Sequence, residues 1–344
     1  MIDLAVVGCG AITRTCHIPA ILLDPKVHLK ALVDPDPTVL DNITRCFKIT
    51  PIRHTSLAEL KSVTAAIVAV PPHLHAAATI HLLSRGIHVL CEKPIATNTS
   101  DAEKMIAEAT RTGTVLAIGF MKRFYPNTYL LKDSLENGDI GTVASFKLTE
   151  GFRSNWDTRN AKRFDPAFVP GGVLYESGVH WIDRLTYWFG EPHVIRYEDD
   201  RLGGVEANAY LELEYVSARG IVRGTIRLSW TNSLENTLEV FGSEGRLILA
   251  DRDPSSVVLF RQAGRSHRRF SLRDEARLSP LYPFERQLDA FGQAIAASQP
   301  DRLANGHDGL RALEILETAY SKRTDLSQPW VFSGLLKHTA PRVV

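Results

Sequence analysis

The chain has 344 residues, and since roughly 150 residues make one domain, this length predicts two domains rather than one small module. Lys and Arg number 40 against 39 Asp and Glu, so the net charge of +1 excludes the broad positive field of proteins that bind nucleic acids or anionic membranes. With 44% hydrophobic and 23% charged residues, the composition is that of a folded globule and excludes a disordered chain.

The first 120 residues alternate runs of β-branched residues with segments whose apolar residues have helical spacing. Strands are predicted at residues 2–7, 27–33, 65–70, 87–91 and 114–119. Helices are predicted between them at residues 11–23, 38–47, 73–84 and 99–111. This alternation is typical of βαβ units, so we expect an α/β fold with a doubly wound parallel sheet.

After about residue 140 the pattern changes to short strands joined by turns. Strands are predicted at residues 143–150, 206–216, 220–230, 234–241 and 246–249, with turn signals such as Gly-Ser-Glu-Gly at 242–245. This pattern favours a second α/β domain whose open sheet is mainly antiparallel. Helices at residues 283–297 and 308–322 are predicted to close the chain.

Two residue types mark the same division of the chain. All five Trp follow residue 150, whereas all four Cys lie in the first part, at Cys9, Cys16, Cys46 and Cys91. We place the boundary between the two predicted domains at residues 121 and 122, which gives domains 1–121 and 122–344.

The compartment follows from the cysteines and the N-terminus. The Cys spacing fits neither a disulfide framework nor a zinc knuckle, so we expect free thiols in a reducing compartment. The N-terminus lacks the basic segment of a signal peptide, and no run approaches the ~18 apolar residues of a membrane span. We therefore expect a cytoplasmic protein with neither a membrane nor a nucleic acid as partner.

A glycine turn follows the first predicted strand directly, with the sequence Gly8-Cys9-Gly10-Ala11-Ile12-Thr13. In a dinucleotide-binding fold, Gly8 forms the tight turn and Gly10 lets the backbone approach a pyrophosphate, which binds N–H groups at the helix start around Ala11 and Ile12. Thr13 stands where such turns have a third Gly, a position that serves packing. The alternative is an ordinary strand–helix turn.

Asp34 ends the second predicted strand at about the 20-residue distance expected for the acid that binds the ribose 2′-hydroxyl. Its carboxylate accepts hydrogen bonds from ribose hydroxyls and repels a 2′-phosphate, so NAD is favoured over NADP as cofactor. The alternative role, capping the next helix, suits Asp36 better because Asp36 precedes Pro37 at a plausible first helical position.

Lys93 follows the predicted strand 87–91, at the sheet edge where ligands of open α/β folds bind. Pro94 fixes the chain after it and permits a cis bond, so the Lys93 ammonium group is held in a defined place where it can meet a substrate oxygen. By position alone, a solvated surface Lys is an equal alternative.

A second candidate segment runs from Gly171 to Asp183. On a helix, Glu176 and Asp183 both lie on the same side as His180, and the carboxylate beside the imidazole suits a general base near neutral pH. The alternative is a surface His–Glu pair, and no third ligand at zinc-binding spacing accompanies it, so no metal is expected. Leu174, Gly178, Trp181, Leu185 and Trp188 are predicted to form the buried face of this helix.

Together these motifs resemble the Gfo/Idh/MocA family of glucose–fructose oxidoreductase, inositol dehydrogenase and the rhizopine-catabolism protein. The resemblance covers nearly the whole chain, through the glycine turn, Gly8 to Gly10, and the segments 69–75, 86–94, 138–141, 171–183 and 308–313. It implies an N-terminal Rossmann domain that binds NAD(P) and a C-terminal domain that binds substrate and forms a homodimer or homotetramer through its sheet.

The resemblance also implies residue roles. Lys93 matches a lysine that contacts substrate and nicotinamide, and His180 matches the usual proton acceptor. Glu176 stands where the family most often has Asp, and Arg123 resembles a residue that lines the substrate site. We also expect the cofactor to contact Pro71, His75 and Glu92. The substrate is expected to contact Asp183 and Trp156, although a Trp in a folded domain is more often part of the core.

The sequence therefore predicts an NAD(P)-dependent enzyme that transfers hydride between nicotinamide and a secondary alcohol or ketone of a sugar, cyclitol or sugar conjugate. One alternative is an enzyme that keeps its NAD bound and uses transient redox to cleave or epimerise a sugar derivative. Another is an NAD-binding regulatory protein without turnover. Because Glu176 is one methylene longer than the usual Asp, inositol or a simple hexose cannot be carried over as the substrate.

Overall fold

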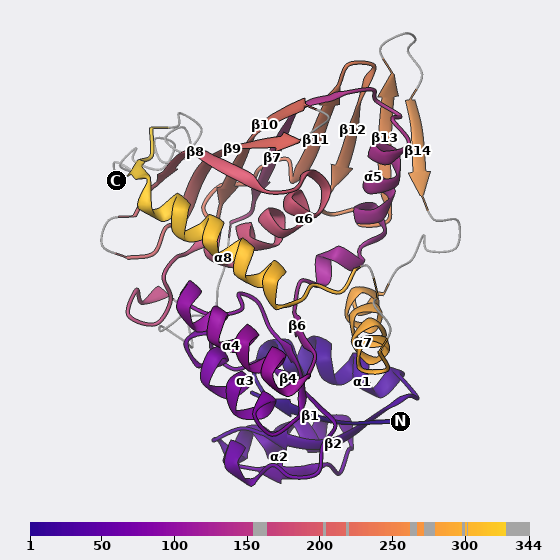
Figure 1. Cartoon of the computed structure of the whole chain (residues 1–344), viewed down its shortest axis with the longest axis vertical. Coiled ribbons are helices and arrows are strands. Elements are labelled where there is room, and N and C mark those ends of the chain that lie inside the picture. The colour runs from indigo at the N-terminus through magenta and orange to yellow at the C-terminus, as the bar shows by residue number, and fades with distance from the viewer. Residues whose placement is uncertain are drawn as a thin grey trace, which may run out of the picture. The chain divides into compact units, whose positions relative to one another are not determined.

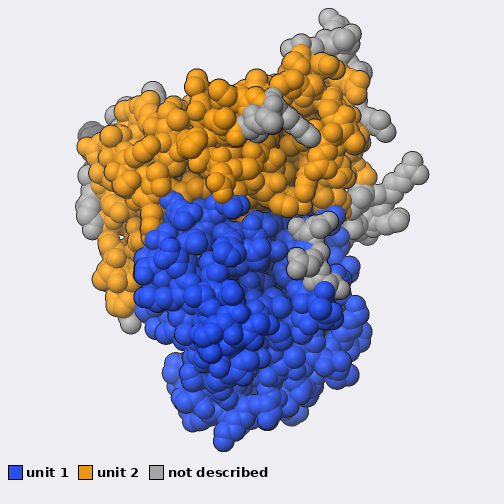
Figure 2. Space-filling view, in the orientation of Figure 1, with its two compact units in different colours: residues 1–125, 277–314 blue, residues 126–276, 315–344 orange. Residues whose placement is uncertain are grey.

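The computed structural model describes residues 1–153, 164–201, 204–217, 220–261, 267–271, 279–297, 300 and 302–327. The chain forms two compact units, coloured separately in Figure 2. Unit 1 contains residues 1–125 and 277–314, and unit 2 contains residues 126–276 and 315–344. Helix α8 begins in the first and ends in the second.

Unit 1 contains a parallel sheet of six strands in the described part of the chain, in the order β3-β2-β1-β4-β5-β6. The strands are β1 Ile2–Val7, β2 Val27–Val33, β3 Ile52–His54, β4 Ala65–Val68, β5 His88–Cys91 and β6 Leu116–Ile118. This is the strand order of a Rossmann fold, with the crevice at the reversal between β1 and β4. The predicted parallel sheet is thus confirmed, whereas the short strand β3 was not predicted.

Two helices of unit 1, α2 and α4, begin at residues whose side chains cap them. Asp36 accepts a hydrogen bond from Thr38 N at the start of α2, as predicted, and Asn98 accepts one from Asp101 N at the start of α4. The helices are α1 Ile18–Leu23, α2 Pro37–Phe47, α3 His75–Leu83, α4 Thr99–Thr112, α7 Tyr282–Ile295 and α8 Gly306–Ser321.

Strand β4 and the second half of β1 are buried on both faces, which explains their apolar residues at 65–68 and 4–7. Leu4, Val6 and Ile67 expose at most 1% of their surfaces and pack in one cluster with helix residues such as Ile18 and Ile43. Each such side chain contributes about 1.5–3 kcal/mol when it leaves water, so this core fixes the strand ends on which the candidate site is built.

Unit 2 contains a sheet with nine strands among the described residues, in the order β14-β13-β12-β11-β7-β10-β9-β8-β15. Neighbouring strands are antiparallel except for the pairs β7–β10 and β8–β15, so the expected mainly antiparallel sheet is confirmed. The strands are β7 Val143–Gly151, β8 Pro192–Asp199, β9 Asn208–Ser217, β10 Gly220–Ser229, β11 Thr237–Gly242, β12 Gly245–Ala250, β13 Ser256–Arg261, β14 His267–Ser271 and β15 Arg323–Asp325.

Helices α5 Pro126–Glu136 and α6 Val179–Phe189 lie against the mixed sheet (Figure 1). The predicted buried face of the segment before and within α6 is mostly confirmed, since Leu174, Trp181 and Leu185 are fully buried. Trp188 is half-buried instead, and its Nε1 donates a hydrogen bond to Thr128 O. No helix in the described segments has the length and hydropathy needed to cross a membrane.

Gly8, at the end of β1, is the position where the backbone most needs a residue without a side chain. Its φ is +92°, and a Cβ there would lie 2.6 Å from both the carbonyl carbon and the oxygen of Ala69. At Gly10 a Cβ would meet nothing within 4 Å. Packing against Ala69 therefore requires glycine at position 8, whereas packing within the protein would permit a side chain at position 10.

We expect Gly8→Ala to lower the free energy of unfolding by about 2–4 kcal/mol, because the new methyl group overlaps backbone atoms at a left-handed φ. Gly10→Ala is the matched control and should change it by less than about 0.5 kcal/mol. Urea denaturation followed by circular dichroism measures both variants. Equal stabilities of the two variants would contradict the assignment.

Candidate active site

The glycine turn leads into a helical segment whose first residues are open to solvent. Gly10 and Ala11 are exposed, Ile12 is half-buried, and a π-type turn, Thr13–His17, precedes α1. The first N–H groups of a helix lack partners within the helix, so they are available to an anion. The buried Thr13 hydroxyl donates a hydrogen bond to Gly8 O at 2.6 Å. This bond joins the turn to the helix, which explains how Thr can stand in place of the third Gly.

Asp34 lies beside this turn with both carboxylate oxygens engaged. Oδ2 accepts a hydrogen bond from Cys9 N at 2.8 Å, and Oδ1 accepts one from Asp36 N at 3.0 Å. Each carboxylate oxygen can accept a further bond, so ribose hydroxyls remain possible partners. The open Gly10 position and the fixed Asp34 carboxylate fit a dinucleotide, with the exposed Pro71 on the loop after the adjacent strand β4.

Cys9 occupies the middle of the turn with its thiol directed inward. Burial and then the charge of Asp34 raise the pKa of Cys9 to about 12. Cys9, Cys16, Cys46 and Cys91 are all free thiols.

Lys93 follows β5, and the Glu92 side chain binds its backbone. Glu92 Oε1 lies 2.8 Å from His17 Nε2, and Glu92 Oε2 accepts a hydrogen bond from Lys93 N at 3.1 Å. Burial alone would raise the pKa of Glu92, but the hydrogen bond and charge of His17, with the charge of Lys93, hold it below its usual value. The Glu92 carboxylate is therefore an internal anchor for the backbone that carries Lys93.

His75 ties this segment to its neighbour. Its ring is buried, with Nδ1 2.7 Å from Pro94 O and Nε2 2.9 Å from Val70 O. The Lys93–Pro94 peptide is cis. Burial lowers the pKa of His75, although the two carbonyl contacts oppose that shift. The loops that follow β4 and β5 are thereby joined through one side chain.

Arg123 lies in a short helical turn, Met121–Phe124, and is buried. Its guanidinium nitrogens Nη1 and Nη2 lie 3.3 Å from Oδ2 and Oδ1 of Asp308, near the start of α8. This forked ion pair fixes the direction of Arg123. The sequence indicates Arg123 as a site residue but carries no local sign of this role of Asp308, although Asp308 lies in one of the family-like segments.

In unit 2, Glu176 and His180 belong to a helical segment that differs from the expected regular α-helix. Residues Leu174–Gly178 form a π-type turn, and α6 begins only at Val179. Such turns concentrate at functional sites, and a similar turn follows the dinucleotide glycines. Glu176 is half-buried, whereas His180 and Asp183 expose 9% and 2% of their surfaces. Trp156, a predicted substrate contact, lies outside the described residues.

Comparison with protein families decides the classification. The family model described as "Oxidoreductase family, NAD-binding Rossmann fold" matches residues 2–120, and the "GFO/IDH/MocA C-terminal domain" model matches residues 129–248. The chain belongs to the Gfo/Idh/MocA oxidoreductase family. The predicted family and fold class are thus confirmed.

Relatives of the chain include proteins named as a sugar-nucleotide reductase and a cyclitol dehydrogenase. It is 27% identical to a dTDP-3,4-didehydro-2,6-dideoxy-alpha-D-glucose 3-reductase of Actinomadura kijaniata, over 95% of this chain and 97% of that protein. It is also 27% identical to a myo-inositol 2-dehydrogenase of Thermotoga maritima, over 75% of this chain and 76% of that protein.

Solved structures share the fold of the Gfo/Idh/MocA chain. The 3-ketoreductase KijD10 from Actinomadura kijaniata, in complex with NADP and TDP-benzene, superimposes with a TM-score of 0.80 at 24% identity, covering 95% of this chain and 99% of that one. The WlbA dehydrogenase from Bordetella pertussis, in complex with NADH and UDP-GlcNAcA, gives 0.75 at 20% identity, covering 93% and 96%.

We expect His17→Ala to lower the free energy of unfolding at pH 7 by about 3 kcal/mol, because Glu92, whose side chain is only 13% exposed, loses the partner of its carboxylate. The folded-state pKa of Glu92 lies below the ordinary value of 4.5, so the pair stabilises the protein above that pH. The loss should therefore shrink as the pH falls below 4.5, a trend that urea denaturation at several pH values measures.

The matched control is His28→Ala, which breaks the exposed pair between His28 and Asp3. That variant should lose less than about 1 kcal/mol at pH 7. If both variants were equally stable, the inward anchoring of Glu92 would be refuted.

Proposed function

We propose that this protein is an NAD(P)-dependent oxidoreductase that interconverts a secondary alcohol and a ketone on a sugar, cyclitol or sugar conjugate. The observation that carries the proposal is the position of Lys93, at the carboxyl end of a strand in a Rossmann sheet, on backbone anchored by the half-buried Glu92 and the buried His75. The names of the dTDP-sugar reductase and inositol dehydrogenase relatives support the substrate class.

The chain's own residues handle the proton and the developing charge. In the direction of oxidation, an imidazole nitrogen of His180 receives the hydroxyl proton, and the Lys93 ammonium group stabilises negative charge on the same oxygen. Glu176, one helical turn before His180, orients the imidazole and balances its positive charge. Arg123, fixed by Asp308, and Asp183 bind substrate hydroxyls. The chemistry that a bound nicotinamide would supply is that of a hydride acceptor or donor.

Gly10, Ala11 and Ile12 are proposed to hold the pyrophosphate, and Asp34 the adenosine ribose. His75 is proposed to act on the cofactor through the Pro71 loop that it supports, and Glu92 through the placement of Lys93. The carboxylate of Asp34 favours NAD over NADP, and the following residues Pro35, Asp36 and Pro37 offer no positive charge to a 2′-phosphate.

We also propose that the protein is a homodimer or homotetramer formed through the mixed sheet of unit 2. Val216 and Ile221 lie opposite each other on β9 and β10, and Ile195 is on the adjacent strand β8. All three side chains are more than half exposed. Apolar side chains gathered on one sheet suit an interface with another copy of the chain.

The test of the activity is an absorbance assay for NADH with inositols, aldoses, amino sugars and nucleotide sugars. We expect Lys93→Ala and His180→Ala each to lower kcat by at least about 100-fold with little change in the Kd for NAD, since both groups act on the reacting oxygen. Lys104→Ala and His193→Ala, at exposed positions, are the matched controls.

Full turnover in either variant would refute the corresponding role. Sugar conversion without net change in NADH absorbance would identify transient redox by a retained nucleotide as the correct alternative.

A separate prediction concerns cofactor choice. We expect the protein to bind NAD at least about tenfold more tightly than NADP, and Asp34→Asn to reduce this ratio because it removes the repulsive charge. Asp36→Asn is the control, since Asn caps α2 as well as Asp does. Titration calorimetry with both nucleotides measures the ratio. Tighter binding of NADP by the unmodified protein would overturn this assignment.

A further inference from the structure

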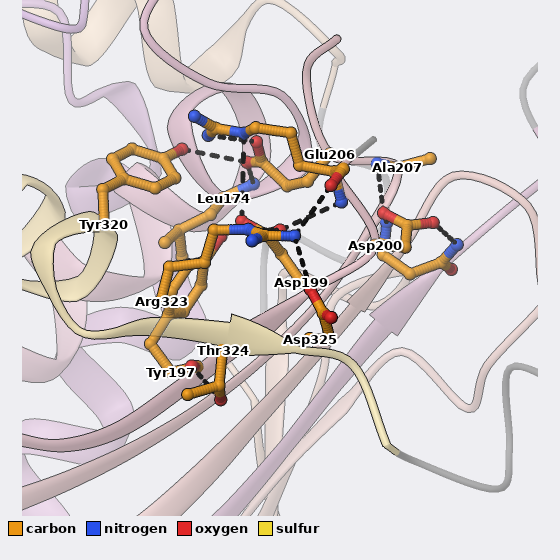
Figure 3. Close-up of polar contacts among 12 residues, drawn as sticks. Leu174, Tyr197, Asp199, Asp200, Glu206, Ala207, Tyr320, Arg323, Thr324 and Asp325 are labelled. Atoms are coloured by element: carbon orange, nitrogen blue, oxygen red, sulfur yellow. Dashed lines mark hydrogen bonds and ion pairs between the residues drawn. The ribbon is translucent and has the colours of Figure 1, made fainter. Parts of the chain in front are cut away.

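Unit 2 contains a buried polar cluster that none of the proposed catalytic roles uses. Its centre is Glu206, which lies between β8 and β9 and has no exposed surface. Figure 3 shows Glu206 with Tyr320 of α8 on one side and the charged residues of β8 and β15 on the other.

The Glu206 carboxylate accepts hydrogen bonds from different parts of unit 2. Oε1 accepts from Leu174 N at 3.1 Å and from the Tyr320 hydroxyl at 2.9 Å, while Oε2 accepts from Arg201 Nη2 at 3.1 Å. Leu174 is the first residue of the π-type turn that contains Glu176. A buried carboxylate thus binds the N-terminal end of the helical segment that carries the candidate catalytic pair.

The residues just before that turn rest on the same cluster. Arg201 Nη2 also donates to Pro170 O at 3.3 Å, and Val173 N donates to Glu206 O at 2.9 Å. Glu206 and Arg201 therefore hold the backbone of this segment at residues 170, 173 and 174.

The close approach of this segment to Tyr320 and Glu206 explains why positions 171 and 172 are both glycine. A Cβ on Gly171 would lie 1.8 Å from the Tyr320 hydroxyl oxygen, and one on Gly172 would lie 1.9 Å from Glu206 O. No larger residue permits this approach without displacement of the segment. The backbone before the turn therefore lies directly against Glu206 and Tyr320.

Residues of strands β8 and β15 stabilise the Glu206 cluster. Arg323 donates to Asp199 Oδ1 at 2.6 Å and to Arg201 O at 2.7 Å, and Arg201 N donates to Asp199 Oδ1 at 3.0 Å. The Arg201 guanidinium stacks over the Tyr320 ring at 4.8 Å. These contacts restrict the position of Arg201, which in turn restricts the position of the Glu206 carboxylate.

We propose that Glu206, supported by Tyr320 and Arg201, is a positioning residue that sets the placement of Glu176 and His180 for proton transfer. It acts through the backbone of residues 170–174 and does not touch the substrate. This inference rests on the proposed function only for its effect on turnover; the placement of His180 is measurable without a substrate.

The test compares two buried glutamates of unit 2 in the full-length protein. Glu206→Gln replaces one acceptor oxygen by an NH₂ group, so at least one of the donors that face the carboxylate meets a donor instead. Burial raises the pKa of Glu206, so loss of its charge also removes a desolvation cost, and the variant is expected to fold. Glu198→Gln is the matched control, since Glu198 is equally buried but accepts from Ser327 and pairs with Arg196.

We expect Glu206→Gln to lower kcat by about 10- to 100-fold with unchanged Kd for NAD, because misplacement of about 1 Å at a reacting centre has that effect. The buried donor that loses its acceptor should also lower the melting temperature by a few degrees, so the comparison of kcat is made at a temperature where both Gln variants are folded. Tyr320→Phe removes one hydrogen bond and should lower kcat by about 3- to 10-fold. Tyr197→Phe, a buried ring packed edge-on against Tyr320 at 5.5 Å, is its control.

An independent measurement needs no turnover. In protein with ¹³C-labelled histidine, the ring resonance of His180, assigned by its loss in His180→Ala, should move in Glu206→Gln and stay in place in Glu198→Gln. An unmoved resonance, or equal loss of kcat in the two Gln variants, would overturn the positioning role. If the unmodified protein turned over no sugar or cyclitol but the resonance moved, the proposed function would fail and the positioning role would stand.

Discussion

Backbone N–H groups that leave regular secondary structure inside the protein must find acceptors, and in this chain carboxylates supply several of them. Asp34 accepts from the glycine turn, Glu92 accepts from Lys93 N, and Glu206 accepts from Leu174 N. Each acceptor lies beneath a segment with a candidate role in binding or catalysis. The need to satisfy buried donors therefore also determines where these segments lie.

This arrangement explains how a protein with a net charge of only +1 can hold an anionic cofactor. The attraction is local, from helix N–H groups beside Gly10, and requires no surplus of Lys or Arg over the surface. Side chains that make several hydrogen bonds are also rigid. A reacting group supported by them keeps its orientation from one turnover to the next. His75 and Glu92 illustrate this in unit 1, as Glu206 does in unit 2.

Sequence alone predicted β1 and β2 to the residue because each is a mainly apolar segment bounded by clear turns. It missed β3, which has three residues and little burial, and β8, which begins with Pro and mixes polar with apolar residues. Lys93 and Asp34 were found because each follows a recognisable strand. The contacts of Glu206 and Asp308 were not, because their partners lie 32 and 185 residues away and leave no local signal. The π-type turn at Leu174–Gly178 was missed because its sequence has ordinary helical spacing.

The buried thiol of Cys9 gives the nucleotide turn a chemical property of its own. With a pKa of about 12, only about one molecule in 10⁵ carries the reactive thiolate at neutral pH. A cysteine in the middle of a binding loop would ordinarily make that loop a target for peroxide and alkylating reagents. Here burial and then the charge of the adjacent Asp34, which shapes the loop, suppress ionisation of the sulfur, so we expect the turn to react slowly with such reagents.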